Sequence, residues 1–289
     1  MNHEIQYFRP NTLKEAASFF SDNPFAYPIA GGTDILVKWK NGGLPQLSHF
    51  VDVRKIVPSM IVKENGKVII GAGCAMNVLA LDPFIAGNFP ALSSAAWSVG
   101  SFQIRNMATI GGNVANASPA GDTIPALLAL DANVILGNSA GTRKIPILEF
   151  FSGPGKTVLK RGDLIEGFEV KNCQTKGAFL KLGTRASNAI SKVSLALSIF
   201  ESKLGSSEFR IALGAVASTV IRCKKAETIL GESSAPFSNE VLNEAMVAVQ
   251  EISKPIDDIR SAKVYRKKMA GVLLKRALIA LRLVSSSVD

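Results

Sequence analysis

Two glycine-rich segments contain the residues best suited to bind a phosphate group. Residues 30–34 read Ala-Gly-Gly-Thr-Asp and lie between a predicted strand at 26–30 and a predicted helix at 33–40. Bare backbone amides and a helix N-terminus can together face an anionic diphosphate. Taken alone, however, this segment is better explained as an ordinary turn between a strand and a helix.

The second segment, residues 100–122, changes that interpretation. It is rich in small residues and in Asn, Ser, Thr and Asp, and it follows neither helical nor strand periodicity. A loop of this length inside a compact domain is usually functional. Its Gly111-Gly112 pair allows the backbone to approach a ligand closely. Hydroxyl and amide groups for phosphate and ribose oxygens are supplied by Thr109, Asn113, Asn116 and Ser118. The two segments together predict a cofactor site.

Two further glycine segments match known motifs only in part. Residues 71–76 follow a predicted strand and precede a predicted helix, but Met76 replaces the third small residue of a dinucleotide fingerprint. The acidic residue expected about 20 residues later is also missing. Residues 137–144 resemble a P-loop, but the glycine spacing is one residue short and Lys does not follow Gly directly. We interpret both segments as structural turns.

The cysteines and histidines exclude several metal and redox chemistries. The three cysteines, Cys74, Cys173 and Cys223, are widely separated, which excludes a disulfide framework, a Cys₄ zinc site or an iron–sulfur cluster held by this chain alone. The two histidines, His3 and His49, cannot form a His-Glu-x-x-His zinc helix, and no nucleophilic triad is evident. We therefore assign no metal ligand and no catalytic residue, and any redox chemistry requires another carrier.

The elements that position the glycine segments change character near residue 175. Before it, short strands alternate with short helices, and Thr12 to Glu15 form a capping box that starts a helix. After it come longer strands and then helices, predicted at 178–182, 193–200, 209–216, 224–230, 239–252 and 261–283. Strands followed by helices are an α+β signature. We therefore predict two domains, residues 1–175 and 176–289.

The chain carries a formal net charge of +10, which favours an acidic partner. Residues 254–282 contain nine basic and two acidic residues. A solvated helix face that docks an acidic subunit explains this cluster better than nucleic-acid binding, because aromatic residues are few and do not alternate with the basic ones. Residues 1–6 lack the features of a signal peptide, and no stretch approaches about 18 apolar residues. We expect a cytoplasmic protein with no membrane span.

Residues 30–34 and 103–122 resemble the two flavin-binding motifs of the FAD subunit of molybdenum hydroxylases, a group that includes xanthine dehydrogenase and carbon monoxide dehydrogenase. The resemblance continues through residues 153–156, Lys181 and residues 221–223, and it is closest to bacterial three-subunit xanthine dehydrogenases. It implies an α+β fold: an FAD-binding domain of the PCMH type with subdomains 1–58 and 59–175, then a CO-dehydrogenase-flavoprotein-like domain. This C-terminal domain is expected to contain three antiparallel strands and helices.

The resemblance implies a non-covalent FAD and a role in electron transfer. Substrate is oxidised at molybdopterin on a large subunit, and electrons pass through [2Fe-2S] clusters on a small subunit to this chain and then to NAD⁺. The implied assembly is a dimer of heterotrimers that oxidises xanthine or another purine. Flavin chemistry of this kind needs no protein acid or base.

Several other functions remain open. A related subunit could serve carbon monoxide, aldehyde or N-heterocycle oxidation. A stand-alone flavin reductase, such as a UDP-N-acetylenolpyruvoylglucosamine reductase, would need a serine or cysteine proton donor and would lack the motif at 103–113. A flavin fold that has lost its cofactor conflicts with the intact motifs.

The resemblance also implies which residues contact the cofactor. Residues 29–36 and 109–113 enclose the diphosphate, Lys181 either favours reduced flavin through its charge or caps a strand, and Ile190 packs beside the isoalloxazine. Asn188 replaces an acid found near the nicotinamide pocket of animal xanthine dehydrogenases. The implied contacts are Ile29, Ala30, Gly31, Gly32, Thr33, Asp34, Ile35, Leu36, Val99, Gly100, Thr109, Ile110, Gly111, Gly112, Asn113, Asn116, Asp122, Ile165, Lys181 and Ile190.

Overall fold

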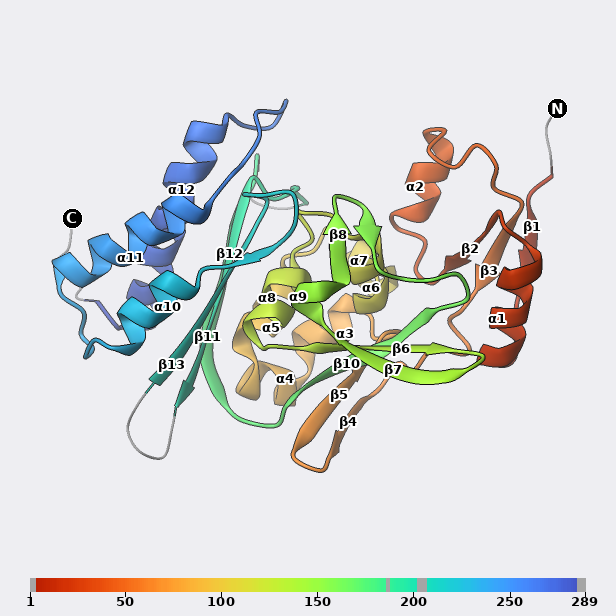
Figure 1. Cartoon of the computed structure of the whole chain (residues 1–289), viewed down its shortest axis with the longest axis horizontal. Coiled ribbons are helices and arrows are strands. Elements are labelled where there is room, and N and C mark those ends of the chain that lie inside the picture. Colours follow the sequence, from red (N-terminus) through yellow and green to blue (C-terminus); the bar gives the residue numbers. More distant parts are fainter. Residues whose placement is uncertain (1–3, 186–187, 202–206, 285–289) are drawn as a thin grey trace.

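A small parallel sheet forms the N-terminal part of the computed structural model, which describes residues 4–185, 188–201 and 207–284 (Figure 1). Its strand order is β1-β3-β2. The Thr12 hydroxyl accepts a hydrogen bond from the Glu15 amide at 3.1 Å and so caps the first helix, as the sequence predicts. The elements are β1 (Gln6–Phe8), α1 (Leu13–Asp22), β2 (Ala26–Ile29), α2 (Ile35–Lys40) and β3 (His49–Asp52).

An antiparallel five-stranded sheet follows, in the order β4-β5-β10-β6-β7. Its strands are β4 (Ile61–Glu64), β5 (Lys67–Gly71), β6 (Asn133–Asn138), β7 (Gly141–Pro146) and β10 (Leu164–Lys171). The remaining elements are α3 (Met76–Leu81), α4 (Pro83–Asn88), α5 (Pro90–Trp97), α6 (Phe102–Met107), α7 (Ile110–Asn116), α8 (Thr123–Ala129), α9 (Ile147–Phe150), β8 (Phe151–Gly153) and β9 (Lys156–Thr157).

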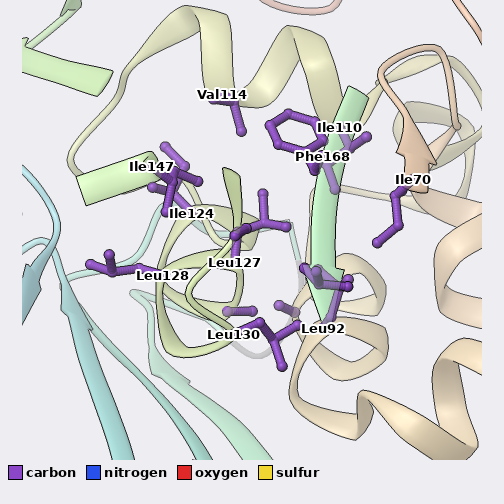
Figure 2. Packing of buried hydrophobic residues seen from close by; sticks show 14 of the residues in the cluster. Ile70, Leu92, Ile110, Val114, Ile124, Leu127, Leu128, Leu130, Ile147 and Phe168 are labelled. Atoms are coloured by element: carbon purple, nitrogen blue, oxygen red, sulfur yellow. The ribbon is translucent and has the colours of Figure 1, made fainter. Parts of the chain in front are cut away.

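The core of this second part lies between the sheet and its helices. Ile70 and Phe168, from adjacent strands, pack with Leu92 of α5, Ile110 of α7 and Leu127 of α8 (Figure 2). All five side chains are fully buried. Because α7 contributes to this core through Ile110 and Val114, its opposite face is fixed in position relative to the sheet.

The segment at 100–122 contains two short helices, α6 and α7, although the sequence predicted an irregular loop. Ser101 and Thr109 each start a short helix: their hydroxyls accept hydrogen bonds from the Ile104 amide at 3.3 Å and the Gly112 amide at 3.1 Å. Ala117 ends α7 in the left-handed conformation, with φ of 48°. Helices α6 and α7 span only six and seven residues, which is too short to produce a clear 3.6-residue pattern.

The C-terminal part is an antiparallel sheet covered by helices on both faces. Its order is β11-β12-β13-β14. Helices α10 to α12 lie on one face (blue in Figure 1), and α5 and α8 contact the other. The elements are β11 (Thr175–Leu182), β12 (Val193–Glu201), β13 (Ser207–Gly214), β14 (Ile221–Arg222), α10 (Lys224–Gly231), α11 (Asn239–Ile252) and α12 (Lys263–Ala280).

Part of the basic C-terminal cluster is structural, which corrects its interpretation as a solvated helix face. The Arg266 side chain is only 4% exposed, pairs with Asp258 and donates to the Ala215 carbonyl oxygen at 3.3 Å. Arg260 also pairs with Asp258, at 2.7 Å. Asp258, in the loop before α12, therefore neutralises two residues of the basic cluster. The spacing of basic residues along the chain could not show these pairs. None of the helices described here is long and apolar enough to cross a membrane.

Candidate functional site

A cavity of about 590 Å³ opens where the three parts of the fold meet. One wall comes from β2, α2 and the turn between them, a second from α6 and α7, and a third from the loop that joins β11 to β12. This volume lies in the range of small-molecule and cofactor sites. Segments far apart in the sequence therefore form one binding space.

The turn after β2 presents a row of backbone amides without acceptors. The amides of residues 31–35 make no hydrogen bond within the described part of the chain, and these residues line the cavity. Gly32 has a φ of 73°, a conformation that glycine adopts without strain. A Cβ on Gly31 would lie 1.8 Å from the Met107 carbonyl oxygen, so only glycine allows this turn to contact the end of α6. Consecutive free amides of this kind bind anions.

Helix α7, on the opposite wall, contributes a small-residue face and no free amides at its start. The Ile110 amide donates to the Cys74 carbonyl oxygen at 3.0 Å, and the Gly111 amide to that of Ala72 at 2.9 Å. A Cβ on Gly111 would lie 2.7 Å from the Ala72 Cβ, so this glycine serves packing. A Cβ on Gly112 would meet only the Thr109 hydroxyl oxygen, at 3.0 Å, and would otherwise project into open space. The two glycines that look equivalent in sequence therefore have different tasks.

Polar side chains on the α7 wall are oriented by neighbouring groups. The Thr123 hydroxyl donates to Asn113 Oδ1 at 2.7 Å, which directs the amide NH₂ of Asn113 away from Thr123 and leaves it available to a ligand. Asn116 is exposed on the same helix and lines the cavity. These two amides can bind oxygen atoms of a bound cofactor.

A buried ion pair borders the cavity and joins residues 100–122 to the C-terminal sheet. Lys181 Nζ and Asp122 Oδ2 are 2.6 Å apart, with side chains 15% and 8% exposed. Burial raises the pKa of the Asp122 carboxyl, and the charge of Lys181 opposes that rise. Lys181 Nζ also donates to the carbonyl oxygens of Ser98, at 2.7 Å, and Ala189, at 3.2 Å.

Most of the residues predicted from the sequence meet in this cavity. Those that line it are Ala30, Gly31, Gly32, Thr33, Asp34, Ile35, Val99, Gly100, Thr109, Gly112, Asn113, Asn116, Asp122 and Ile190. Those that do not line it are Ile29, Leu36, Ile110, Gly111, Ile165 and Lys181. Ile110 and Ile165 belong to the hydrophobic core, and Lys181 is occupied by Asp122. Direct contact between these six residues and a cofactor stays a prediction.

The sequence did not identify several other lining residues. Tyr27, Lys38 and Leu44 belong to the N-terminal part, and Arg260 precedes α12. Arg260 lies in the basic cluster, but only the tertiary structure places it beside Asn188 and Ile190 at the same cavity. No local pattern could have distinguished it from its basic neighbours.

Comparison with known proteins agrees with this architecture. Residues 3–170 match the FAD binding domain in molybdopterin dehydrogenase, and residues 178–281 match the CO dehydrogenase flavoprotein C-terminal domain. The chain is 30% identical over 277 residues to a putative xanthine dehydrogenase FAD-binding subunit from Escherichia coli K12, covering 94% of both chains. It is 29% identical over 289 residues to the nicotinate dehydrogenase FAD-subunit of Eubacterium barkeri, covering 96% of this chain and 95% of that one.

A solved structure gives the same result. Carbon monoxide dehydrogenase from Hydrogenophaga pseudoflava contains a chain that superposes with a TM-score of 0.89 at 30% identity, covering 96% of both chains. The fold is therefore that of an FAD-binding oxidoreductase subunit. The chain belongs to the molybdopterin dehydrogenase family of FAD-binding proteins, and this confirms the family and the fold expected from its motifs.

Proposed function

We propose that this chain is the FAD-carrying electron-transfer subunit of a molybdopterin-dependent hydroxylase that oxidises xanthine or another purine. In this proposal, a small subunit supplies electrons from [2Fe-2S] clusters, a large subunit carries molybdopterin, and NAD⁺ is the acceptor. The three subunits form a heterotrimer that pairs into a dimer. The chain has three cysteines, too few for a Cys₄ cluster site of its own.

The observation that carries the proposal is the row of acceptor-free amides at residues 31–35. FAD contains a diphosphate, and the row supplies several N–H donors within one continuous turn. Gly112 leaves room on the facing helix, and Asn113 and Asn116 supply donors and acceptors for further oxygen atoms. The residues present therefore fit the cofactor of this family.

The residues of this chain bind and orient the cofactor, and they need not transfer a proton. When bound, FAD can accept single electrons from an iron–sulfur centre and donate a hydride. Around it, Val99, Gly100 and Ile190 supply apolar or small surfaces that exclude water from the site. Asp122 and Lys181 neutralise one another beneath the cavity, so the pair adds no net charge there.

Purine oxidation is proposed because of the similarity to xanthine dehydrogenase subunits, and oxidation of another substrate is the alternative. Relatives at nearly the same identity are named for nicotinate and for carbon monoxide. The substrate is oxidised on the large subunit in this proposal, so the cavity described above does not select it. Steady-state assays of the purified complex with xanthine, nicotinate, an aldehyde and carbon monoxide distinguish these alternatives.

The cofactor is tested on the isolated chain. We expect one FAD per chain, seen as the visible absorption of oxidised flavin, and release of this colour into the supernatant after acid precipitation. Colour that stays with the precipitate would indicate a covalent flavin. Failure of the folded chain to bind FAD would refute the proposed function.

A further inference from the structure

The two neighbours of Ile190 are attached to opposite members of the buried ion pair. Lys181 Nζ donates to the Ala189 carbonyl oxygen at 3.2 Å, and the Ser191 hydroxyl donates to Asp122 Oδ1 at 2.6 Å. Lys181 and Asp122 are themselves joined at 2.6 Å. Ile190 therefore lies between two anchored residues.

The ammonium group of the ion pair has no remaining donor, and each oxygen of the carboxylate accepts a hydrogen bond from the protein. The ammonium group of Lys181 has three donors, and these are taken by Asp122, Ser98 and Ala189. The carboxylate of Asp122 uses one oxygen for Lys181 and the other for Ser191. Ser98 follows α5, so the pair also ties the loop to the FAD-binding part of the chain. The pair thus connects the loop, α5 and the segment before α8.

Ile190 has no comparable anchor of its own. Its side chain is 61% exposed and lines the cavity, and it belongs to none of the hydrophobic clusters among the described residues. Nearby, the Lys192 amide donates to the Leu182 carbonyl oxygen at 2.7 Å, which only closes the base of the loop. A segment with so few buried apolar contacts opens locally at low cost unless polar anchors hold it.

We propose that Asp122, Lys181 and Ser191 are positioning residues that fix Ile190 in the wall of the FAD cavity. This inference rests on the proposed function, because it assigns Ile190 to the surface that covers bound FAD. Because the loop already holds this apolar side chain in place, FAD binding does not pay the entropic cost of ordering the loop. The side chain can then exclude water from the bound cofactor. The role assigned here to the three residues is to act on the cofactor through Ile190.

The test is a double-mutant cycle on FAD affinity. Ser191→Ala removes one anchor and leaves the charge pair intact, and Ile190→Ala removes the anchored side chain. We expect each variant to raise the Kd for FAD by about fivefold to tenfold, the scale of one typical intramolecular hydrogen bond. The double variant should bind no more weakly than the weaker single variant, because both changes remove the same contribution.

Ser198→Ala is the matched control. Ser198 lies on β12, is 0% exposed against 1% for Ser191, and its hydroxyl has no hydrogen-bond partner in the described residues. The Ser198→Ala substitution removes a hydroxyl group from an equally buried position that does not line the cavity. We expect its Kd for FAD to equal that of the wild type.

Hydrogen exchange gives a second readout that a general loss of stability would not produce. In Ser191→Ala, the amides of residues 188–192 should exchange faster, with those of α12 unchanged.

If Ser191→Ala does not fold, Ser191→Cys replaces it, since a thiol is nearly isosteric and a weak donor. A wild-type Kd in the Ser191 variant, or additive effects in the double variant, would overturn the inference. Failure of the wild type to bind FAD would instead overturn the proposed function.

Discussion

At the scale of single residues, the two adjacent glycines of α7 show how similar sequence positions acquire different functions. Gly111 packs against Ala72, whereas Gly112 lines the cavity. Both belong to the motif on which the family resemblance rests, so that motif includes a packing residue as well as a residue that lines the cavity. The structure separates the two roles, and substitution can measure them.

Gly112→Val should weaken FAD binding at least about tenfold while the protein stays folded. A Cβ at this position would meet only the Thr109 hydroxyl oxygen among the described residues, and Gly112 lines the cavity, so the valine side chain should occupy space in it. Calorimetric titration with FAD measures the loss, and circular dichroism checks the fold. Gly87→Val is the control, because Gly87 lies in helix α4 and a Cβ added there would have no neighbour within 4 Å among the described residues. Full FAD affinity in Gly112→Val would place the cofactor elsewhere.

Gly111→Val should instead reduce the yield of folded protein. A Cβ at this position lies 2.7 Å from the Ala72 Cβ and 2.8 Å from the Ala72 carbonyl oxygen, so larger side chains force the strand–helix contact apart. Overpacking of a core typically costs about 1–3 kcal/mol. Urea denaturation measures the free energy of unfolding. A variant as stable as the wild type that merely loses FAD would contradict the packing role.

At the scale of elements, the sequence predicts the long regular segments well and the site-forming helices poorly. Helix α11 was expected at 239–252 and lies at Asn239–Ile252. Strands β11 to β13 of the C-terminal sheet were also expected close to their observed positions, whereas the two-residue strand β14 was not expected. Helices α6 and α7 were missed because their capping residues and tertiary contacts, and not periodicity, specify them. The anchoring of Ser191 to Asp122 spans 69 positions in sequence and leaves no local pattern.

The end of β3 contains a buried carboxylate whose stabilising effect should depend on pH. Asp52 is 0% exposed, and Arg54 donates to it from Nε at 2.9 Å and from Nη2 at 2.7 Å. The hydrogen bonds from Arg54 hold the pKa of Asp52 well below its usual range. A lowered folded-state pKa means that the stabilisation is present above the unfolded pKa of about 3.9 and is lost as pH falls below it.

Asp52→Asn should therefore destabilise the protein by about 1–3 kcal/mol at pH 7. The difference from the wild type should shrink as the pH falls below about 4, where the wild-type carboxylate begins to lose its advantage. Urea denaturation between pH 3 and pH 7 measures this, with Asp22→Asn on the exposed end of α1 as the control. A difference that stays constant across this range would exclude the ion-pair explanation.

At the scale of the whole molecule, the cavity exists only because the three parts of the fold are assembled. The amide row comes from one part, the α7 face from the second, and Asn188, Ile190 and Arg260 from the third. The family resemblance pointed to residues on all three walls, including Ile190 on the third, but it did not identify Arg260. The third depends on how the C-terminal sheet packs against α5 and α8, which the sequence pattern does not specify.

The exposed part of the basic cluster should contribute to subunit association. Lys263, Lys267 and Lys268 are exposed, unlike Arg266. Attraction to an acidic partner subunit would weaken as salt screens it. Lys267→Glu combined with Lys268→Glu should reduce association and its salt dependence, measured by sedimentation velocity. The same change at the exposed Lys156 and Lys160 is the control. Equal association in both double variants would show that the cluster does not dock the partner.

The most direct test of the proposed electron path uses the assembled complex with its FAD removed. We expect substrate to bleach the iron–sulfur absorption as in the intact complex, with no NADH formed, and NADH formation to return when FAD is added. This result would place FAD between the iron–sulfur clusters and NAD⁺ in the path of the electrons. NADH formation at the normal rate by the complex that lacks FAD would contradict the account.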